Sequence, residues 1–221
     1  MKKRSTRRFA AAIVFLVLFL CVTALVLFVD RRPVGPENSV VGLAGINRAV
    51  ADAVGVNMLW YKITKYIGYA AFLAVGFFGI LGLGQWIARR SLKAVNPDLF
   101  VTAGLYVVVL GIYAFFEKVI INYRPVILDE GLEASFPSSH TMLGMTVFLA
   151  AAVWFSKNII RPALRRTLVI AFSAAAAVTV IGRMISGVHW LTDIAASVFL
   201  GAFLVFLYDG ILLKIKERKS R

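Results

Sequence analysis

The sequence predicts an all-α membrane protein in which six transmembrane helices form one bundle. Hydrophobic residues make up 60% of its 221 residues, which is more than a soluble domain of this size carries. They gather in six runs, each close to the roughly 20 residues that a helix needs to cross a bilayer. No internal repeat or low-complexity linker is evident, so residues 1–221 are predicted to form a single domain.

The six apolar runs, in chain order, are residues 9–29, 66–88, 98–116, 140–157, 167–186 and 193–213. The first run follows residues 1–8, a segment rich in Lys and Arg, and this order also occurs in a signal peptide. The run is longer than the apolar part of a signal peptide, however, and no small-x-small cleavage site follows it. It is therefore predicted to stay as a membrane anchor. It contains Cys21, the single cysteine, so an intrachain disulfide is impossible.

Residues 42–60, between the first two runs, are mixed in character. Leu43, Ile46, Val50 and Val54 recur at helical spacing. We expect either a short amphipathic helix on the outer membrane surface or a loop that packs on the bundle.

The distribution of Lys and Arg predicts the orientation of the bundle, because cytoplasmic loops of membrane proteins are enriched in them. Four stretches hold 17 of the 25 basic residues: 1–8, 89–97, 157–166 and 214–221. Placing them inside puts both termini in the cytoplasm. The net charge of +14 lies in short clusters and not on one continuous basic face, which argues against a nucleic-acid partner. Compact size and the absence of an organelle signal favour a bacterial plasma membrane.

His189 and Asp193 are four residues apart at the start of the last run, so both side chains lie on one face of a helix. Asp193 can then accept a hydrogen bond from one ring nitrogen and leave the other free to attack. The alternative is a structural pair, in which the two side chains only satisfy each other's hydrogen-bonding groups at the membrane interface. Arg183 favours the functional interpretation, because an unpaired arginine near a bilayer is costly. Gly187 offers a break at which Arg183 and His189 can converge on one anion.

Residues 137–140 read Pro-Ser-Ser-His and open the fourth run. Proline suits the first turn of a helix, where its missing N–H is not needed. The amides of Ser138, Ser139 and His140 would then face an anion at the positive end of the helix dipole. His140 can protonate a leaving oxygen. A serine-rich helix cap without catalytic function is the alternative.

Arg124 and Lys118 add positive charge near the end of the third run. Pro125 keeps Arg124 out of a helix, and its guanidinium fork matches two phosphate oxygens. Lys118 either joins Arg124 or extends to the membrane surface, as basic residues at helix ends commonly do. A nucleophile, an acid and several cations together indicate phosphate transfer.

These three clusters resemble the signature of the type-2 phosphatidic-acid phosphatase superfamily, the integral-membrane lipid phosphatases. That signature reads Lys-(six)-Arg-Pro, then Pro-Ser-Gly-His, then Ser-Arg-(five)-His-(three)-Asp. With the six apolar runs, the resemblance covers nearly the whole chain. There are three departures. Ser139 replaces the family glycine, and Gly182 replaces the serine before the arginine. Glu117 occupies the lysine position, while Lys118 follows one residue later, about 100° round a helix.

The resemblance implies that His189 attacks phosphorus and forms a phosphohistidine while Asp193 holds the ring. His140 would protonate the departing lipid oxygen and then activate water. No metal or other cofactor is expected, because the cations are protein-borne. The phosphate contacts that the resemblance implies are Arg124, Arg183, Ser138, Ser139 and Lys118.

The resemblance implies hydrolysis of an outward-facing lipid phosphate or diphosphate at the extracytoplasmic side of the membrane. Undecaprenyl diphosphate is the favoured candidate, beside phosphatidylglycerol phosphate and phosphatidic acid. A lipid phosphotransferase would use the same site with another acceptor. A lipid-phosphate binding or transport protein would need the cations but not the pair formed by His189 and Asp193. The oligomeric state is not predicted.

Overall fold

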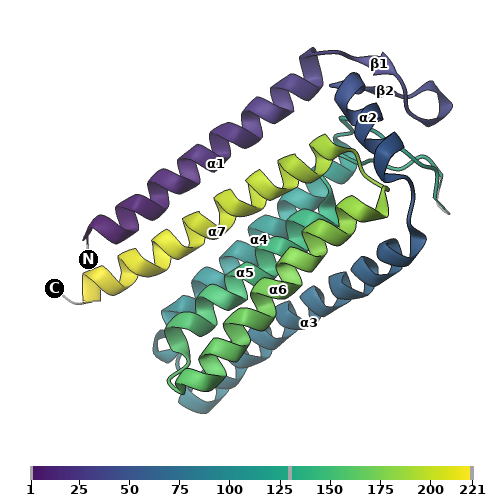
Figure 1. The fold of residues 1–221 in the computed structure, drawn as a ribbon. Helices are drawn as coiled ribbons and strands as arrows, with labels where there is room; N and C mark the ends of the chain where they lie inside the picture. Colours follow the sequence, from purple (N-terminus) through teal and green to yellow (C-terminus); the bar gives the residue numbers. More distant parts are fainter. Residues whose placement is uncertain (1, 129–130, 220–221) are drawn as a thin grey trace.

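The computed structural model describes residues 2–128 and 131–219. Within these residues the chain forms seven α-helices and one pair of short antiparallel strands (Figure 1). The helices are α1 (Lys2–Phe28), α2 (Ala44–Val54), α3 (Met58–Arg89), α4 (Pro97–Lys118), α5 (Ser139–Asn158), α6 (Pro162–Ser186) and α7 (Leu191–Lys219). The remaining elements are the strands β1 (Arg32–Pro33) and β2 (Val40–Val41) and the 3-10 turns η1 (Pro36–Asn38) and η2 (Leu92–Ala94).

Six of the described helices, α1 and α3 to α7, are long and apolar enough to cross a membrane. Each covers one of the six apolar runs, although α1 ends one residue before the first run does, so the predicted all-α, six-helix membrane architecture is confirmed. Most of the helices extend past their runs, because polar turns at a helix end can lie at the membrane surface while the apolar middle spans the hydrocarbon.

The start of α3 differs most from the prediction, because the helix begins at Met58 and not at residue 66. The side chain of Asn57 caps this start by accepting a hydrogen bond from the Trp60 N–H (3.2 Å). Lys62 and Lys65 lower the apolar character of the first two turns, which is why hydropathy alone places the start later.

The segment between the first two spans contains α2, so a helix forms there, and its last residues belong to α3. Asn47 of α2 is fully buried. Its side-chain amide donates to Thr192 Oγ1 (2.9 Å), and its Oδ1 accepts from the Thr192 N–H (3.2 Å). Thr192 lies in the first turn of α7. α2 therefore packs on the end of the bundle and caps the start of α7.

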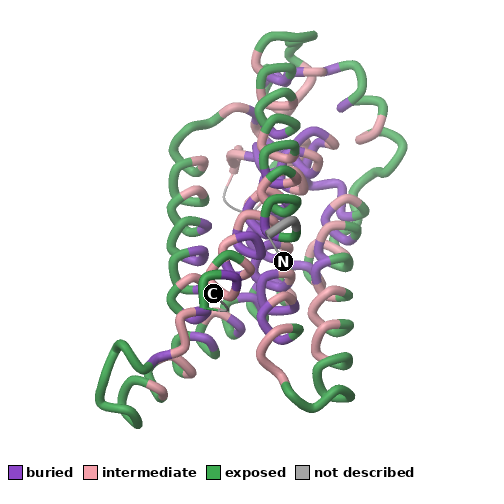
Figure 2. Tube along the Cα trace, turned by 90° about the vertical axis from the view of Figure 1, so that its left-hand side faces the viewer, coloured by how far each residue is buried: buried purple, intermediate pink, exposed green. Residues whose placement is uncertain are grey.

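α5 lies at the centre of the bundle and contacts α3, α4, α6 and α7 (Figure 1). It is the most buried of the spanning helices. Figure 2 shows that buried residues gather in the middle of the bundle and exposed residues on its outer helices. Small residues such as Gly144, Ala150 and Ala151 let its neighbours approach. The outer helices expose apolar side chains such as Leu73 and Ile80, as expected of surfaces that face lipid tails.

The first turns of α1 and the last turns of α7 lie at one end of the bundle, and α2 with both strands lies at the other (Figure 1). The start of α5, the end of α6 and the start of α7 all lie at the α2 end. The three motifs therefore gather at a single end of the bundle.

Candidate active site

Five of the residues singled out in the sequence lie close together at the α2 end: Arg124, His140, Arg183, His189 and Asp193. We call them the site cluster. The charges of both arginines and the ring of His140 act electrostatically on His189, and its Nδ1 lies 3.7 Å from Asp193 Oδ2. In chain order, the five residues of the site cluster come from the α4–α5 loop, the start of α5, the end of α6, the α6–α7 connection and the start of α7.

Asp193 is held by groups other than the histidine. Its Oδ2 accepts hydrogen bonds from the Trp190 N–H (2.9 Å) and the Ser135 hydroxyl. The 3.7 Å between Asp193 Oδ2 and His189 Nδ1 is too long for a hydrogen bond. Both ring nitrogens of His189 and Oδ1 of Asp193 are buried without a hydrogen-bond partner in the part of the chain that the structure describes. Buried polar atoms of this kind indicate a site that a ligand completes.

His189 lies between α6 and α7, outside the spanning helices. Burial lowers the pKa of its imidazole well below the ordinary value, and the charges of Arg124 and Arg183 lower that pKa further. The ring is therefore neutral at neutral pH, and one nitrogen keeps a free lone pair. This is the form in which a histidine can act as a nucleophile.

The two arginines carry unpaired donors. Arg183 is fully buried at the end of α6, and within the described residues none of its three guanidinium nitrogens has a hydrogen-bond partner. Its guanidinium carbon lies 5.1 Å from the centre of the Tyr61 ring. Arg124 pairs with Glu133 through Nη2 (2.9 Å), while its Nε and Nη1 have no partner among the described groups. Two buried cations with open N–H groups require an anion.

The start of α5 differs in part from the expectation. Ser138 is the N-cap, and its N–H donates to the Asp193 carbonyl (3.3 Å) while its hydroxyl shares a hydrogen bond with Thr141 (2.9 Å). It therefore anchors α5 to α7, and its backbone N–H is occupied. Pro137 precedes the cap and does not lie in the first turn. Ser139 and the following histidine are the first helical residues, whose N–H groups have no partner within a helix.

Lys118 does not join the site cluster. It is the last residue of α4, its side chain is exposed, and no contact with the cluster occurs among the described residues. Glu117, which occupies the family's lysine position, lines a small cavity together with Ser135 and Ser139. The one-residue shift in sequence thus turns the lysine away from the site and places a carboxylate nearer to it.

A different lysine lies near the site. A cavity of about 230 Å³ opens between α3, α4 and α5, and its lining includes Lys65 and His140. The rest of the lining is mainly apolar or aromatic and consists of Gly68, Tyr69, Phe72, Tyr113, Ser139 and Leu143. Sequence reasoning missed Lys65, because it precedes the apolar run. Two signals could have found it. Asn57 is a helix-capping residue that would place the start of α3 before Lys65, and Tyr61 lies one helical turn before the lysine on the same helix.

Two glycines bring α3 close to the site. A Cβ atom on Gly182 would lie 2.6 Å from Thr64 Cγ2 and 2.9 Å from the Trp60 ring. A Cβ on Gly68 would lie 3.3 Å from the His140 ring. The glycine that replaces the family serine therefore lets α3 pack against α6, and this packing positions Lys65 beside His140.

Gly187 forms the predicted break between α6 and α7. Its φ of 66° lies in the left-handed region, which glycine adopts without strain. A Cβ there would also lie 1.8 Å from the Gly55 carbonyl oxygen, so no larger residue fits. The turn ends α6 three residues after Arg183 and brings His189 to the same anion site.

A family model described as the PAP2 superfamily matches residues 115–215, which include the whole site cluster. Over this stretch the chain is similar to the PAP2 superfamily. The matched region lies within a bundle of six helices that are long and apolar enough to cross a membrane. Phosphatidylglycerophosphatase B of Bacillus subtilis (strain 168) is 28% identical over 158 residues, which are 71% of this chain and 75% of that protein.

A solved structure has the same fold. It is the crystal structure of the first transmembrane PAP2 type phosphatidylglycerolphosphate phosphatase from Bacillus subtilis. It matches with a TM-score of 0.67 at 20% sequence identity and covers 93% of this chain and 97% of its own.

The close approach at Gly182 makes restoration of the family serine harmful. We expect Gly182→Ser to destabilise the protein by about 1–3 kcal/mol, the usual cost of overpacking, and to lower phosphatase activity. Thermal unfolding in detergent and phosphate release would measure the two effects. Gly104→Ser is the matched control, because no atom lies within 4 Å of a Cβ at Gly104. Equal behaviour of the two variants would contradict the packing argument.

Ser135 is expected to position Asp193. Ser135→Ala removes a hydrogen bond to a carboxylate, which is worth about 1.5–3 kcal/mol, so we expect kcat to fall at least about tenfold with little change in KM. The measurement is steady-state phosphate release by the purified enzyme. Ser156→Ala, at the far end of α5, is the control. An unchanged kcat in Ser135→Ala would argue against this role.

Proposed function

We propose that this protein is a PAP2 lipid phosphatase that hydrolyses a membrane lipid phosphate without a metal ion, through a phosphohistidine at His189. The supporting observation is a buried, neutral imidazole beside Asp193 and two arginines with unpaired donors. A phosphate monoester would supply the negative charge that Arg183 lacks, and it would accept from the Arg124 N–H groups that Glu133 leaves unpaired. It would also place phosphorus within reach of the His189 nitrogen that faces away from Asp193.

The first step forms one bond and breaks one. His189 Nε2 attacks phosphorus as the bond to the lipid oxygen breaks. His140, which takes up a proton from water as the phosphate dianion binds beside it, gives that proton to the lipid oxygen. The Nδ1–H of His189 then gains a hydrogen bond to Asp193, which requires the present 3.7 Å separation to close by less than 1 Å. Arg124 and Arg183 stabilise the charge on the non-bridging oxygens.

The second step releases phosphate. His140, now neutral, takes a proton from water, and the water oxygen bonds to phosphorus as the bond to His189 breaks. Inorganic phosphate leaves, and both histidines regain their starting protonation states. Ser139 and the start of α5 contribute amide N–H groups to the phosphate oxygens in both steps. Ser138 and Lys118 have no place in this mechanism.

Lys65 supports a substrate class. Because His140 protonates the leaving oxygen, the leaving group lies on the His140 side of the phosphate, in the cavity that Lys65 also lines. A cation there suits a leaving group that carries a second phosphate. Phosphatidylglycerol phosphate and undecaprenyl diphosphate both have one, whereas phosphatidic acid does not. The apolar lining from Phe72 and Leu143 would receive the first part of a lipid tail.

We propose phosphatidylglycerol phosphate as the preferred substrate, because the similar Bacillus subtilis protein is a phosphatidylglycerophosphatase. Undecaprenyl diphosphate is the second candidate, favoured by the same lysine. The site would face the extracytoplasmic side, since the basic terminal segments lie at the opposite end of the bundle (Figure 1).

Histidine catalysis is tested with lipid labelled at the terminal phosphate. We expect the purified protein in EDTA to release one inorganic phosphate per lipid consumed, and a quench in alkaline SDS to trap a phosphoprotein that is stable in base and labile in acid. His189→Ala should lose both signals. Full turnover by His189→Ala would exclude the phosphohistidine. Loss of lipid phosphate without release of inorganic phosphate would favour a phosphotransferase, and binding without turnover would favour a transport protein.

The role of Lys65 is tested by substrate comparison. We expect Lys65→Met to lower kcat/KM for phosphatidylglycerol phosphate about tenfold, the effect of one charge-assisted hydrogen bond, and to change kcat/KM for phosphatidic acid less than about twofold. Lys62→Met, one turn earlier on α3 and exposed, is the matched control. Equal losses on both lipids would mean that Lys65 contacts the transferred phosphate and does not select the leaving group.

A further inference from the structure

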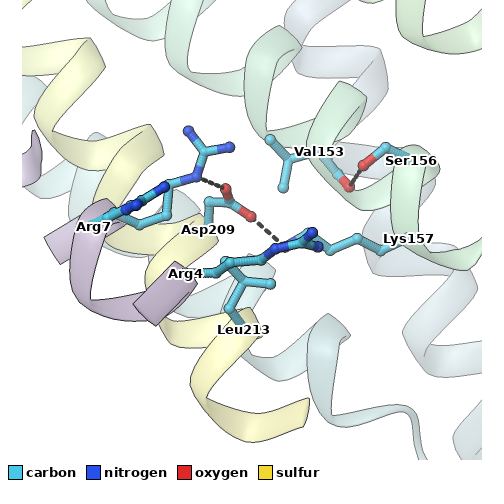
Figure 3. Close-up of a pocket in the computed structure, with 8 residues that line it drawn as sticks. Arg4, Arg7, Val153, Ser156, Lys157, Asp209 and Leu213 are labelled. Carbon is cyan, nitrogen blue, oxygen red and sulfur yellow. Dashed lines mark hydrogen bonds and ion pairs between the residues drawn. The ribbon is translucent and has the colours of Figure 1, made fainter. Parts of the chain in front are cut away.

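A second charged cavity lies at the opposite end of the bundle from the site cluster. It has a volume of about 530 Å³ and lies between α1, α5 and α7 (Figure 3). Along α5, 17 residues separate His140 from Lys157, or about 25 Å of helix. The cavity is therefore separate from the catalytic chemistry. Its lining consists of Arg4, Arg7, Arg8, Val153, Ser156, Lys157, Asp209 and Leu213.

The cavity holds an excess of positive charge around one fixed carboxylate. Asp209 on α7 pairs with Arg8 Nε (2.7 Å) and with Lys157, and only 10% of the Asp209 side chain is exposed. These pairs hold α1 and α5 against α7. Arg4 and Arg7 line the same cavity and have no ion-pair partner in the described part of the chain. Four cations thus face one anion.

The start of α1 adds to this positive potential. Arg4 and Arg7 lie in the first two turns of α1, near the positive end of its dipole. The first turn contains no acidic residue that would offset the dipole. An anion bound in the cavity would relieve the repulsion among the arginines and would also interact favourably with the dipole.

An aromatic stripe marks the membrane side of the cavity. The Arg8 guanidinium carbon lies 5.4 Å from the centre of the Phe206 ring. Phe206 stacks on Phe15, with ring centres 5.4 Å apart, and Phe199 lies beside Phe15 at 6.4 Å. These rings continue from the cavity toward the middle of the bundle. The arrangement pairs a cationic recess with an apolar strip below it, which matches a phosphate headgroup and its acyl chain.

We propose that this cavity binds the phosphate-bearing headgroup of an anionic phospholipid in the leaflet opposite to the active site. Arg4 and Arg7 bind the phosphate, and Asp209 keeps Arg8 and Lys157 in place around it. Basic pockets between membrane helices bind anionic headgroups in this way. The volume accommodates a glycerophosphate headgroup. The inference depends on the six-helix bundle and not on the proposed substrate.

The test is native mass spectrometry of the purified full chain in neutral detergent, titrated with phosphatidylglycerol, phosphatidylcholine or inorganic phosphate. The variant is Arg4→Gln with Arg7→Gln. The control is Arg165→Gln with Arg166→Gln, an exposed pair near the start of α6 at the same end of the bundle. Both variants remove the same charge from the surface.

We expect phosphatidylglycerol to bind the native chain about tenfold more tightly than phosphatidylcholine. The cavity variant should weaken phosphatidylglycerol binding about tenfold, and the control should weaken it less than about twofold. Equal weakening by both variants would overturn the proposal in favour of diffuse surface charge. Displacement of the lipid by equimolar inorganic phosphate would also overturn it, since the site would then hold a small anion and not a lipid.

Phosphatase activity separates this proposal from the proposed function. Arg4→Gln with Arg7→Gln lies far from the site cluster and should leave phosphate release in neutral detergent unchanged. The loss of lipid binding in this variant therefore does not depend on whether the catalytic assignment is right.

Discussion

The hydrogen bonds around Asp193 hold the active end of this protein together. The carboxylate accepts from the Trp190 N–H and the Ser135 hydroxyl, and the carbonyl of the same residue accepts from the Ser138 N–H and the Ser197 hydroxyl. One residue therefore joins the α4–α5 loop, the start of α5 and the α6–α7 connection. Each of these segments supplies part of the site cluster, so their mutual positions depend on this buried carboxylate and its neighbouring peptide group.

The approach of α3 is the second determinant of the site. Glycines at positions 68 and 182 remove the Cβ atoms that would hold α3 away from α5 and α6. α3 then contributes Tyr61 under the Arg183 guanidinium and Lys65 beside His140. The catalytic motifs lie on other helices, which have the residues that a phosphate monoester requires. In the proposed mechanism α3 faces the leaving group, which is the part of the molecule in which the candidate lipid phosphates differ from one another.

Much of this arrangement could be predicted from the sequence, and the remainder depends on tertiary contacts. The spans were predictable because bilayer thickness fixes their length, and the break at Gly187 followed from local conformation. His189 and Asp193 lie together as predicted, but not because they share a helix face, since α7 begins at Leu191 and His189 precedes it. Spacing does not reveal which donors are already occupied, so the role expected of Ser138 fails once its N–H meets a carbonyl of α7. Lys65 and Ser135 lie outside every motif, and only packing brings them to the site.

The ion pair between Arg124 and Glu133 has a consequence for selectivity in a crowded bilayer. Glu133 acts as an internal surrogate for phosphate, so the empty site does not leave the Arg124 charge wholly uncompensated. A ligand that binds both arginines competes with this carboxylate for the Arg124 charge. A phosphodiester headgroup carries one negative charge and offers no gain over the carboxylate that it would replace. A phosphate monoester can carry two charges and does offer one. Under the proposed function, this competition would discriminate against the bulk phospholipids that outnumber the substrate.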